Sequence, residues 1–404
     1  MSSEWVETTW GDVATLEYGK AIRDYQNAKG EFPVYGTNGA IGWHHAPLCN
    51  SAGVVIGRKG AYRGIHYSKK PFFVIDTAFY LKPKTQVNMK WAYYCLLTYD
   101  INGMDSGSAI PSTSRDEFYK LPVRLPSLNE QERIAEVLSI FDDRIALLRE
   151  TNATLEAIAQ ALFKSWFVDF DPVHAKQQGI APVGLDEATA ALFPDSFEES
   201  ALGLVPKGWR VGTLGDIAAT VRKQLQPSEL HSELHYVGLE HIPRKSSSLS
   251  AWDNAEGLES AKASFDKGDI LFGKLRPYFH KVVIAPFDGV CSTDILVCQP
   301  KAPAYYGLTA MHLFSTTLID YADRLSNGAK MPRVNWKDLA DYPICVPPET
   351  VGANYSETIT PLVSRMVANV HQAQTLATLR DTLLPRLISG QLRLPEAEAM
   401  LEGT

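Results

Sequence analysis

The sequence of 404 residues has few cysteines and no long apolar run. Its five cysteines form no Cys-x-x-Cys pair and no set with the spacing of a zinc site, and their odd number argues against a disulfide framework. No window reaches the roughly 18 apolar residues that a membrane-spanning helix needs, and the first residues lack the basic and apolar stretches of a secretion signal. We therefore expect a cytoplasmic protein with reduced, mostly buried thiols, no metal site and no contact with a membrane.

Motifs for catalysis are also missing. Gly268–Leu275 has the Gly-x4-Gly-Lys spacing of a phosphate-binding loop, but a leucine stands where a serine or threonine must reach magnesium. The glycine-rich segment Gly36–Gly42 lacks the Gly-x-Gly-x-x-Gly order of a dinucleotide-binding fold. The only Pro-Pro pair, Pro347-Pro348, is not in an adenine methyltransferase motif, and no histidine pairs with a nucleophile or carboxylate set. We expect no catalytic residue and no cofactor bound by this chain.

Positive charge is not in excess, which is unusual for a protein that binds nucleic acid. The formal net charge is −7. By region, however, residues 1–125 carry +3 and residues 206–347 carry +1, whereas the remaining segments together carry −11. A local positive face on the two globular segments is therefore compatible with the acidic total.

The most informative feature that the sequence does contain is an internal repeat. The offset between the copies is 204 residues near the start of each copy and 221 residues later, so insertions separate the two sets of matches. Such a period is too long for a solenoid or a propeller, and we infer a duplicated domain followed by a duplicated helix, which favours a two-part ligand. The matching pairs include Trp5 and Trp209, Thr9 and Thr213, Gly11 and Gly215, Asp12 and Asp216, Gly107 and Gly328, Pro111 and Pro332, and Pro122 and Pro343.

A long amphipathic helix is predicted after the first domain. Ser127–Glu130 has the capping-box pattern, in which a serine hydroxyl and a glutamate bond each other's free backbone amides. Apolar residues then recur in steps of three and four for about 33 residues, or roughly 50 Å, and Asn152 within this seam can fix the register of a helix pair. The residues predicted to pair the two helices are Leu138, Phe141, Ile145, Leu148, Leu155, Leu162, Trp166, Leu362, Met366, Leu376, Leu383 and Leu387.

The second helix is expected to be shorter. Thr360-Pro361 is typical of an N-cap and a first helical residue, so we expect a break before it, and Pro385 should end or kink the helix after about 25 residues. Each helix could pack only on its own domain, but a two-fold relation between the copies favours antiparallel pairing.

We predict an α/β (mixed α+β) fold in which two similar domains are separated by two long helices forming an antiparallel coiled coil, with a pseudo-two-fold internal repeat. The Pro-, Gly- and acid-rich segment between the first helix and the second domain should be a linker that gives slack. The expected boundaries are a first domain at 1–125, a first spacer helix at 126–170, a linker at 171–205, a second domain at 206–347, a second spacer helix at 348–395 and a C-terminal tail at 396–404.

Five segments together resemble the specificity subunits of Type I restriction-modification systems: Asn129–Ala135, Ala161–Phe170, Val205–Trp209, Gly268–Tyr278 and Arg380–Gly390. The resemblance covers essentially the whole chain. It implies two target recognition domains that each read one half of a bipartite DNA sequence, and a helix pair that docks methyltransferase subunits. It also implies a non-catalytic role beside two methyltransferase subunits that carry S-adenosylmethionine and two ATP-dependent restriction subunits that need ATP-Mg.

Candidate DNA contacts are polar and basic residues in loops, because phosphates attract Lys and Arg, whereas base edges bond Arg, Asn, Ser and Thr. Any one of them could instead be a solvated surface residue, and the chain could be a scaffold whose two domains bind proteins rather than DNA. Since the loops of the two domains differ in composition, we expect an asymmetric target. The candidates are Thr37, Asn38, Arg58, Lys59, Tyr62, Arg63, Ser108, Ser112, Thr113, Ser114 and Arg115 in the first domain, and Arg244, Lys245, Lys274, Arg276, Tyr278, Lys281, Lys330, Arg333 and Asn335 in the second.

Overall fold

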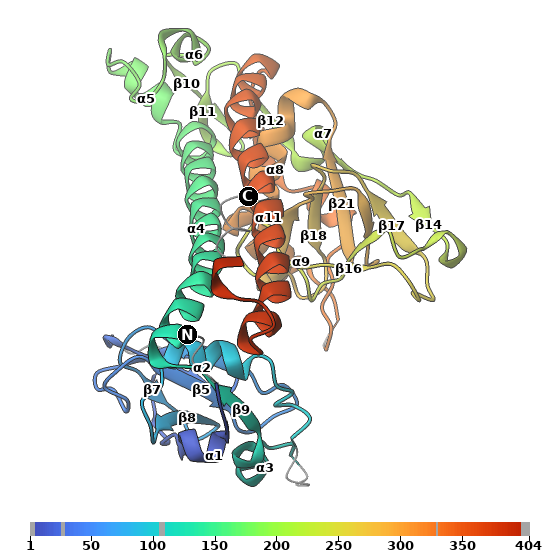
Figure 1. Cartoon of the computed structure of the whole chain (residues 1–404). Helices are drawn as coiled ribbons and strands as arrows, with labels where there is room; N and C mark the ends of the chain where they lie inside the picture. The colour runs from blue at the N-terminus through green and yellow to red at the C-terminus, as the bar shows by residue number, and fades with distance from the viewer. Residues whose placement is uncertain (1–4, 26–28, 105–109, 329, 397–404) are drawn as a thin grey trace. The chain divides into compact units, whose positions relative to one another are not determined.

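The structure is a computed structural model that describes residues 5–25, 29–104, 110–328 and 330–396 (Figure 1). Gly107 and the candidate contact Ser108 lie outside the described residues. The chain divides into two compact units, one made of Met1–Arg144 with Thr375–Thr404 and the other of Ile145–Gln374. The first unit therefore contains both the beginning and the end of the chain.

The first domain combines short strands with short helices around an aromatic core. The elements are β1 (Val6–Thr9), α1 (Trp10–Val13), β2 (Ala14–Tyr18), β3 (Phe32–Gly36), β4 (Gly39–His44), β5 (Gly53–Gly57), β6 (Ile65–Ser68), β7 (Phe73–Val74), β8 (Ala78–Pro83), α2 (Met89–Leu96), α3 (Arg115–Lys120) and β9 (Pro122–Leu125). One sheet has the antiparallel order β2-β8-β5-β6, a second has the order β4-β3-β7, and β1 pairs with β9. Trp10 lies 6.4 Å from Trp91 and 6.0 Å from Phe118 between ring centroids, and all three are fully buried. This core holds the three helices on the larger sheet.

The second domain repeats this plan with more strands. The elements are β12 (Arg210–Thr213), α7 (Leu214–Ile217), β13 (Ala218–Thr220), β14 (Gln224–Leu225), η1 (Pro227–Glu229), β15 (His235–Val237), β16 (Asp253–Asn254), β17 (Lys262–Phe265), β18 (Ile270–Gly273), η2 (Pro277–Phe279), β19 (Val282–Ile284), β20 (Gly289–Cys291), β21 (Ile295–Pro300), η3 (Pro303–Tyr305), α8 (Tyr306–Phe314), α9 (Thr316–Leu325), α10 (Trp336–Ala340) and β22 (Pro343–Val346). Its sheets have the orders β13-β21-β18-β19 and β14-β17-β20-β15-β16, and β12 pairs with β22.

The internal repeat predicted from the sequence is confirmed by the topology. The order β2-β8-β5-β6 in the first domain corresponds to β13-β21-β18-β19 in the second, and the pair β1-β9 corresponds to β12-β22. The repeated glycines have a steric reason. A Cβ atom on Gly11 would lie 2.9 Å from the carbonyl oxygen of Tyr119, and one on Gly215 would lie 3.1 Å from that of Ala340. A side chain would clash with the backbone at Gly11 and would push its neighbour aside at Gly215, so glycine suits both copies where the first short helix meets the last one of the domain.

Two helices of 40 residues each, α4 (Leu128–Phe167) and α11 (Glu349–Ile388), run antiparallel in both units (Figure 1). In the first unit Arg380 donates to Asp142 at 2.7 Å, and in the second Tyr355 donates to the carbonyl oxygen of Ala159 at 3.0 Å. Within the second unit, Asn152 bonds Asn369 whereas Ala159 bonds Tyr355, so residue numbers fall along α11 as they rise along α4, and the helices are antiparallel. At the start of α4, the hydroxyl of Ser127 accepts a hydrogen bond from the Glu130 backbone amide at 3.4 Å.

The predicted shortening of the second helix is wrong, because α11 continues through Pro361 and extends three residues beyond Pro385. Both prolines are exposed. Because proline has no backbone N–H, Pro361 cannot donate to the carbonyl oxygen of Glu357, but Glu357 is also exposed and this oxygen can bond water instead. The opposite face of the helix is buried through Tyr355 and Ile359. Packing on this face maintains the helix where the local preference of proline would end it.

The predicted linker is also wrong, because most of it is folded. It contains α5 (Asp171–Gln177), α6 (Glu187–Ala191) and the hairpin of β10 (Phe197–Ser200) with β11 (Gly203–Pro206). Phe193 is buried between Trp166, at 5.2 Å, and Trp209, at 6.2 Å between ring centroids. The few apolar side chains of this segment pack into the core of the second domain. Their burial stabilises a folded segment although its composition is typical of a loop.

The residues predicted to pair the helices are buried or half-buried. Leu138 and Phe141 share one cluster with Leu383 and Leu387, and the same cluster includes Trp91 of the first domain. The helices therefore pack on each other and on a domain, rather than only on their own domain. The buried members are Leu138, Phe141, Ile145, Leu148, Trp166, Met366, Leu383 and Leu387, and the half-buried ones are Leu155, Leu162, Leu362 and Leu376.

Candidate nucleic-acid interface

In the first domain, candidates that are distant in the sequence come together beyond the end of β5. The amide of Thr113 donates to the carbonyl oxygen of Arg58 at 2.9 Å, and the amide of Gly60 donates to that of Pro111 at 3.0 Å. The hydroxyl of Thr37 joins them by donating to the carbonyl oxygen of Lys59 at 3.0 Å. We name this set the first loop cluster; it comprises residues 37–38, 58–63 and 110–115.

The second domain repeats this arrangement beyond the end of β18. The amide of Val334 donates to the carbonyl oxygen of Lys274 at 3.1 Å, and the amide of Arg276 donates to that of Pro332 at 2.8 Å. These bonds match those of the first cluster at sequence offsets of 216 and 221 residues. The backbone amide of Lys245 adds a third segment by donating to the carbonyl oxygen of His280 at 2.9 Å. We name this set the second loop cluster; it comprises residues 244–245, 274–281 and 330–335.

Two arginines of the first cluster flank one tyrosine. The guanidinium carbon of Arg58 lies 4.8 Å from the ring centroid of Tyr18 and that of Arg115 lies 5.1 Å from it. Arg58 also donates to the carbonyl oxygen of Asp76 at 2.9 Å. Hydrogen bonds to Tyr18 and Tyr119 raise the pKa of Arg115. Stacking and hydrogen bonds hold both cations in defined positions, which suits contact with phosphate or guanine.

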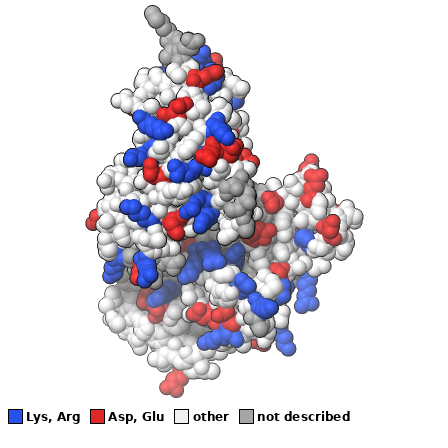
Figure 2. All heavy atoms as spheres, turned by 90° about the horizontal axis from the view of Figure 1, so that it is seen from below, with Lys and Arg blue, Asp and Glu red and all other residues white. Residues whose placement is uncertain are grey.

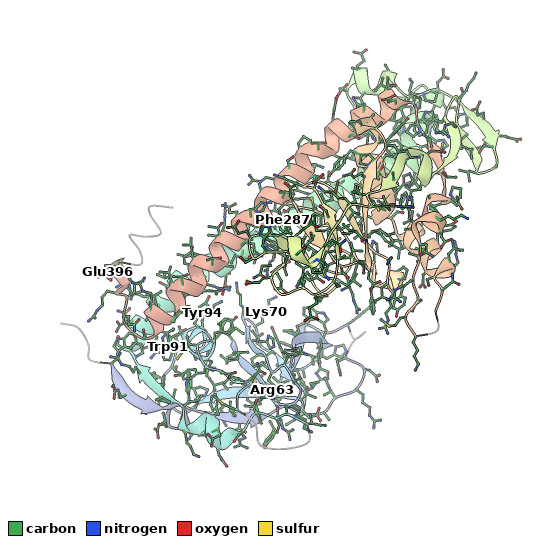
Figure 3. All side chains as sticks on the ribbon, turned by 90° about the vertical axis from the view of Figure 1, so that its right-hand side faces the viewer. Arg63, Lys70, Trp91, Tyr94, Phe287 and Glu396 are labelled. Carbon is green, nitrogen blue, oxygen red and sulfur yellow. The ribbon has the colours of Figure 1, made fainter. Side chains whose placement is uncertain are left out.

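Arg63 was predicted as a contact residue, and its burial shows that this prediction is wrong. Its side chain is 3% exposed and lies inside the first domain (Figure 3). It donates to the carbonyl oxygens of Gly60 at 3.0 Å and Asn102 at 2.6 Å. A guanidinium that bonds several backbone carbonyls holds a loop in shape and is shielded from an external ligand.

Other candidates also support the loops. Thr113 is buried and donates to the carbonyl oxygen of Gly57 at 2.8 Å, and the hydroxyl of Ser114 caps α3 by accepting from Glu117 at 3.3 Å. Asn335 is the N-cap residue of α10, and Ser112 is half-buried and pairs with Lys59. The exposed candidates of the first cluster are Asn38, Lys59 and Tyr62.

Ion pairing and aromatic contacts order the cations of the second cluster. Arg333 donates to both carboxylate oxygens of Asp294, at 3.0 and 3.3 Å, and this hydrogen bonding raises the pKa of Arg333. The guanidinium carbon of Arg244 lies 3.9 Å from the ring centroid of Phe279. Lys281 donates to the carbonyl oxygen of Leu239, and partial burial lowers its pKa. Exposed members are Arg244, Lys245, Tyr278, Lys330, Arg333 and Asn335, whereas Lys274 and Arg276 are half-buried.

Sequence reasoning missed Tyr18 beside the first loop cluster and did not consider the residues that correspond to it in the second domain. Tyr18 was not chosen, although the guanidinium carbons of two chosen arginines, Arg58 and Arg115, lie 4.8 and 5.1 Å from its ring centroid. The offset of 204 residues could also have indicated Arg222 and Lys223, which follow β13 where Tyr18 ends β2, and which are exposed. On the face drawn in Figure 2, Lys and Arg are interspersed with Asp and Glu, so neither sign of charge covers that face.

Within the described part of the chain, no cluster of three His, Cys, Asp or Glu side chains could hold a metal ion. None of the described helices is long and apolar enough to cross a membrane. All five cysteines are free thiols, and burial raises the pKa of each of them.

A sequence model described as the Type I restriction modification DNA specificity domain matches residues 2–157 and 206–372. The chain belongs to this family. The two matches cover both copies of the internal repeat, so the chain has two DNA specificity domains.

Relatives of this specificity family match most of the chain. The specificity subunit of the Type I restriction enzyme EcoDI from Escherichia coli is 25% identical and aligns with 96% of this chain and 89% of its own length. The MjaIX specificity subunit from Methanocaldococcus jannaschii is 27% identical over 78% of this chain and 71% of its own length. The crystal structure of the Type I S subunit from M. genitalium is similar in fold, with a TM-score of 0.56, 17% identity and coverage of 95% of this chain and 96% of that one. The EcoDI and MjaIX relatives are named specificity subunits, which are recognition components rather than catalytic ones.

Proposed function

We propose that this chain reads an asymmetric bipartite sequence in double-stranded DNA, with one loop cluster for each half. The observation that carries the proposal is that the two clusters have the same backbone hydrogen bonds but different side chains. Position 58 of the first cluster is arginine where the second has Lys274, and position 112 is serine where the second has Arg333. A common scaffold with different base-reading groups supports two different half-sites.

The family supports a place for this chain in a larger complex. We propose that it docks two methyltransferase subunits and two restriction subunits, which would bring S-adenosylmethionine and ATP-Mg respectively, while this chain binds neither cofactor. A cytoplasmic location is part of this proposal, because the proposed DNA ligand would be met there. In the chain, α4 lies between the two domains and α11 follows the second. Together they are proposed to fix the number of base pairs between the half-sites.

Selection from a random duplex library tests this function. The full chain, with its methyltransferase subunits, would be incubated with 40-base-pair duplexes, and bound DNA would be sequenced. We expect two unlike half-sites at one fixed spacing, and affinity that falls linearly with the logarithm of salt concentration. Scrambling either half-site should abolish specific binding. Equal recovery of all sequences would contradict the proposal and favour a scaffold that binds proteins.

A further inference from the structure

Each loop cluster exposes a pair of large apolar side chains. In the first cluster Tyr62 is 81% exposed and Ile110 is 61% exposed. In the second, Tyr278 is 48% exposed and Met331 is 49% exposed. A single exposed apolar residue is ordinary on a protein surface, but a pair that recurs in both copies of a duplicated domain needs a reason.

The two pairs occupy equivalent positions on the repeated backbone. Ile110 and Met331 each directly precede the proline whose carbonyl oxygen accepts the hydrogen bond between the two loops. Tyr62 and Tyr278 each follow two residues after the amide that donates this bond. The same backbone pairing therefore presents both apolar side chains in each domain.

The neighbours of these side chains are cationic. In the first cluster, Lys59 lies in the same loop as Tyr62. In the second, the guanidinium of Arg276 donates to the carbonyl oxygen of Lys330, the residue before Met331, at 3.2 Å. Duplex DNA matches such a surface, because it offers phosphates to the cations and base edges, including the thymine methyl group, to apolar side chains. Isoleucine and methionine cannot donate to phosphate, so apolar parts of the bases, such as the thymine methyl group, are the DNA groups that suit them.

We propose that Ile110 and Met331, each with its tyrosine, make apolar contacts with bases and determine the sequence preference of one half-site each. This inference rests on the proposed function, since it requires that the two clusters bind DNA. It assigns the four apolar residues to sequence discrimination and leaves phosphate binding to the surrounding cations.

Library selection with two single variants tests the inference. Ile110→Ser should relax the preference at one or two positions of one half-site by roughly tenfold, and it should leave the other half-site and the salt dependence unchanged. Met331→Ser should have the reverse effect on the two half-sites. Ile180→Ser is a matched control, because Ile180 is 56% exposed and belongs to neither cluster; it should change nothing.

The possible outcomes separate this inference from the function on which it rests. If the unmodified chain selects two half-sites and both serine variants select the same sequences equally well, the inference is overturned and the function stands. If the unmodified chain selects no half-site, the function itself fails. Because both side chains are exposed, thermal unfolding of the variants should match that of the unmodified chain, so a loss of preference cannot be assigned to misfolding.

Discussion

Asn369 of α11 donates a hydrogen bond from its side-chain amide to the side-chain oxygen of Asn152 on α4 at 2.8 Å, and both residues are buried. Asn152 in turn donates to the carbonyl oxygen of Met366 at 3.1 Å. These two bonds form at one register only, so a shift of either helix along the other would break both. Within the described residues the side-chain oxygen of Asn369 has no partner, so the pair fixes the register without being fully satisfied.

Replacing one member of this pair should cost more than replacing both. Asn152→Leu removes the acceptor of Asn369 and should lower the free energy of unfolding by roughly 1–3 kcal/mol. Asn152→Leu combined with Asn369→Leu should recover most of that loss, because neither helix then buries an unpaired amide. Urea unfolding of the three proteins measures the difference; a double variant as unstable as the single one would contradict this account.

Much of this arrangement could be predicted from the sequence, and the exceptions have physical reasons. The repeat is visible as matching residues at constant offsets, and the helix start at Ser127 follows from a local capping pattern, so both were found. Asn369 was missed because its polar side chain interrupts the apolar seam, and only the facing Asn152 explains it. The helix break predicted before Pro361 is absent because packing of the buried face of α11 outweighs the local preference of proline. Arg63 and Arg58 look alike in sequence, and only tertiary contacts distinguish the buried Arg63, which supports a loop, from the half-buried Arg58.

Arg63→Ala and Lys59→Ala should separate stability from DNA affinity. Loss of the buried Arg63 leaves the carbonyl oxygens of Gly60 and Asn102 without their donor, and should lower the free energy of unfolding by roughly 2–4 kcal/mol. Lys59→Ala should change stability by less than about 0.5 kcal/mol and reduce the salt slope of DNA binding by about one. Chemical unfolding and anisotropy titrations at several salt concentrations measure both. A large loss of stability in Lys59→Ala, together with a reduced salt slope in Arg63→Ala, would show that Lys59 supports the fold and Arg63 binds DNA.

His312 should make the protein sensitive to acid. It is buried against Phe163 at 4.8 Å between ring centroids, and burial lowers its pKa to about 3. Since the unfolded chain takes up this proton near pH 6.5, the stabilising contribution is complete above that pH and falls by about 1.4 kcal/mol per pH unit as the pH drops towards 3. His312→Leu should flatten the stability profile between pH 6 and 4.5, whereas the exposed control His45→Leu should not. Urea unfolding midpoints measured across this pH range test the prediction. If His312→Leu loses stability with falling pH as steeply as the unmodified chain, His312 is not the cause.

The thiols should be nearly inert in the folded chain. Burial raises the pKa of Cys49, Cys95 and Cys291 to about 12 and that of Cys345 to about 11, so the reactive thiolate is scarce at neutral pH. Ellman's reagent at pH 8 should label less than one thiol per native chain, with the half-buried Cys49 reacting first, and all five in denaturant. Rapid labelling of several thiols without denaturant would indicate a looser core.

The joining of both chain ends in one unit has a consequence for synthesis on the ribosome. Leu138 and Phe141 are translated about 245 residues before Leu383 and Leu387, with which they share a cluster. At 5–20 residues per second, this apolar face stays uncovered for on the order of 10 to 50 s. We therefore expect chaperones to bind the nascent first domain until the last helix emerges. A ribosome that stalls before that point would hold an incomplete chain with an exposed apolar surface.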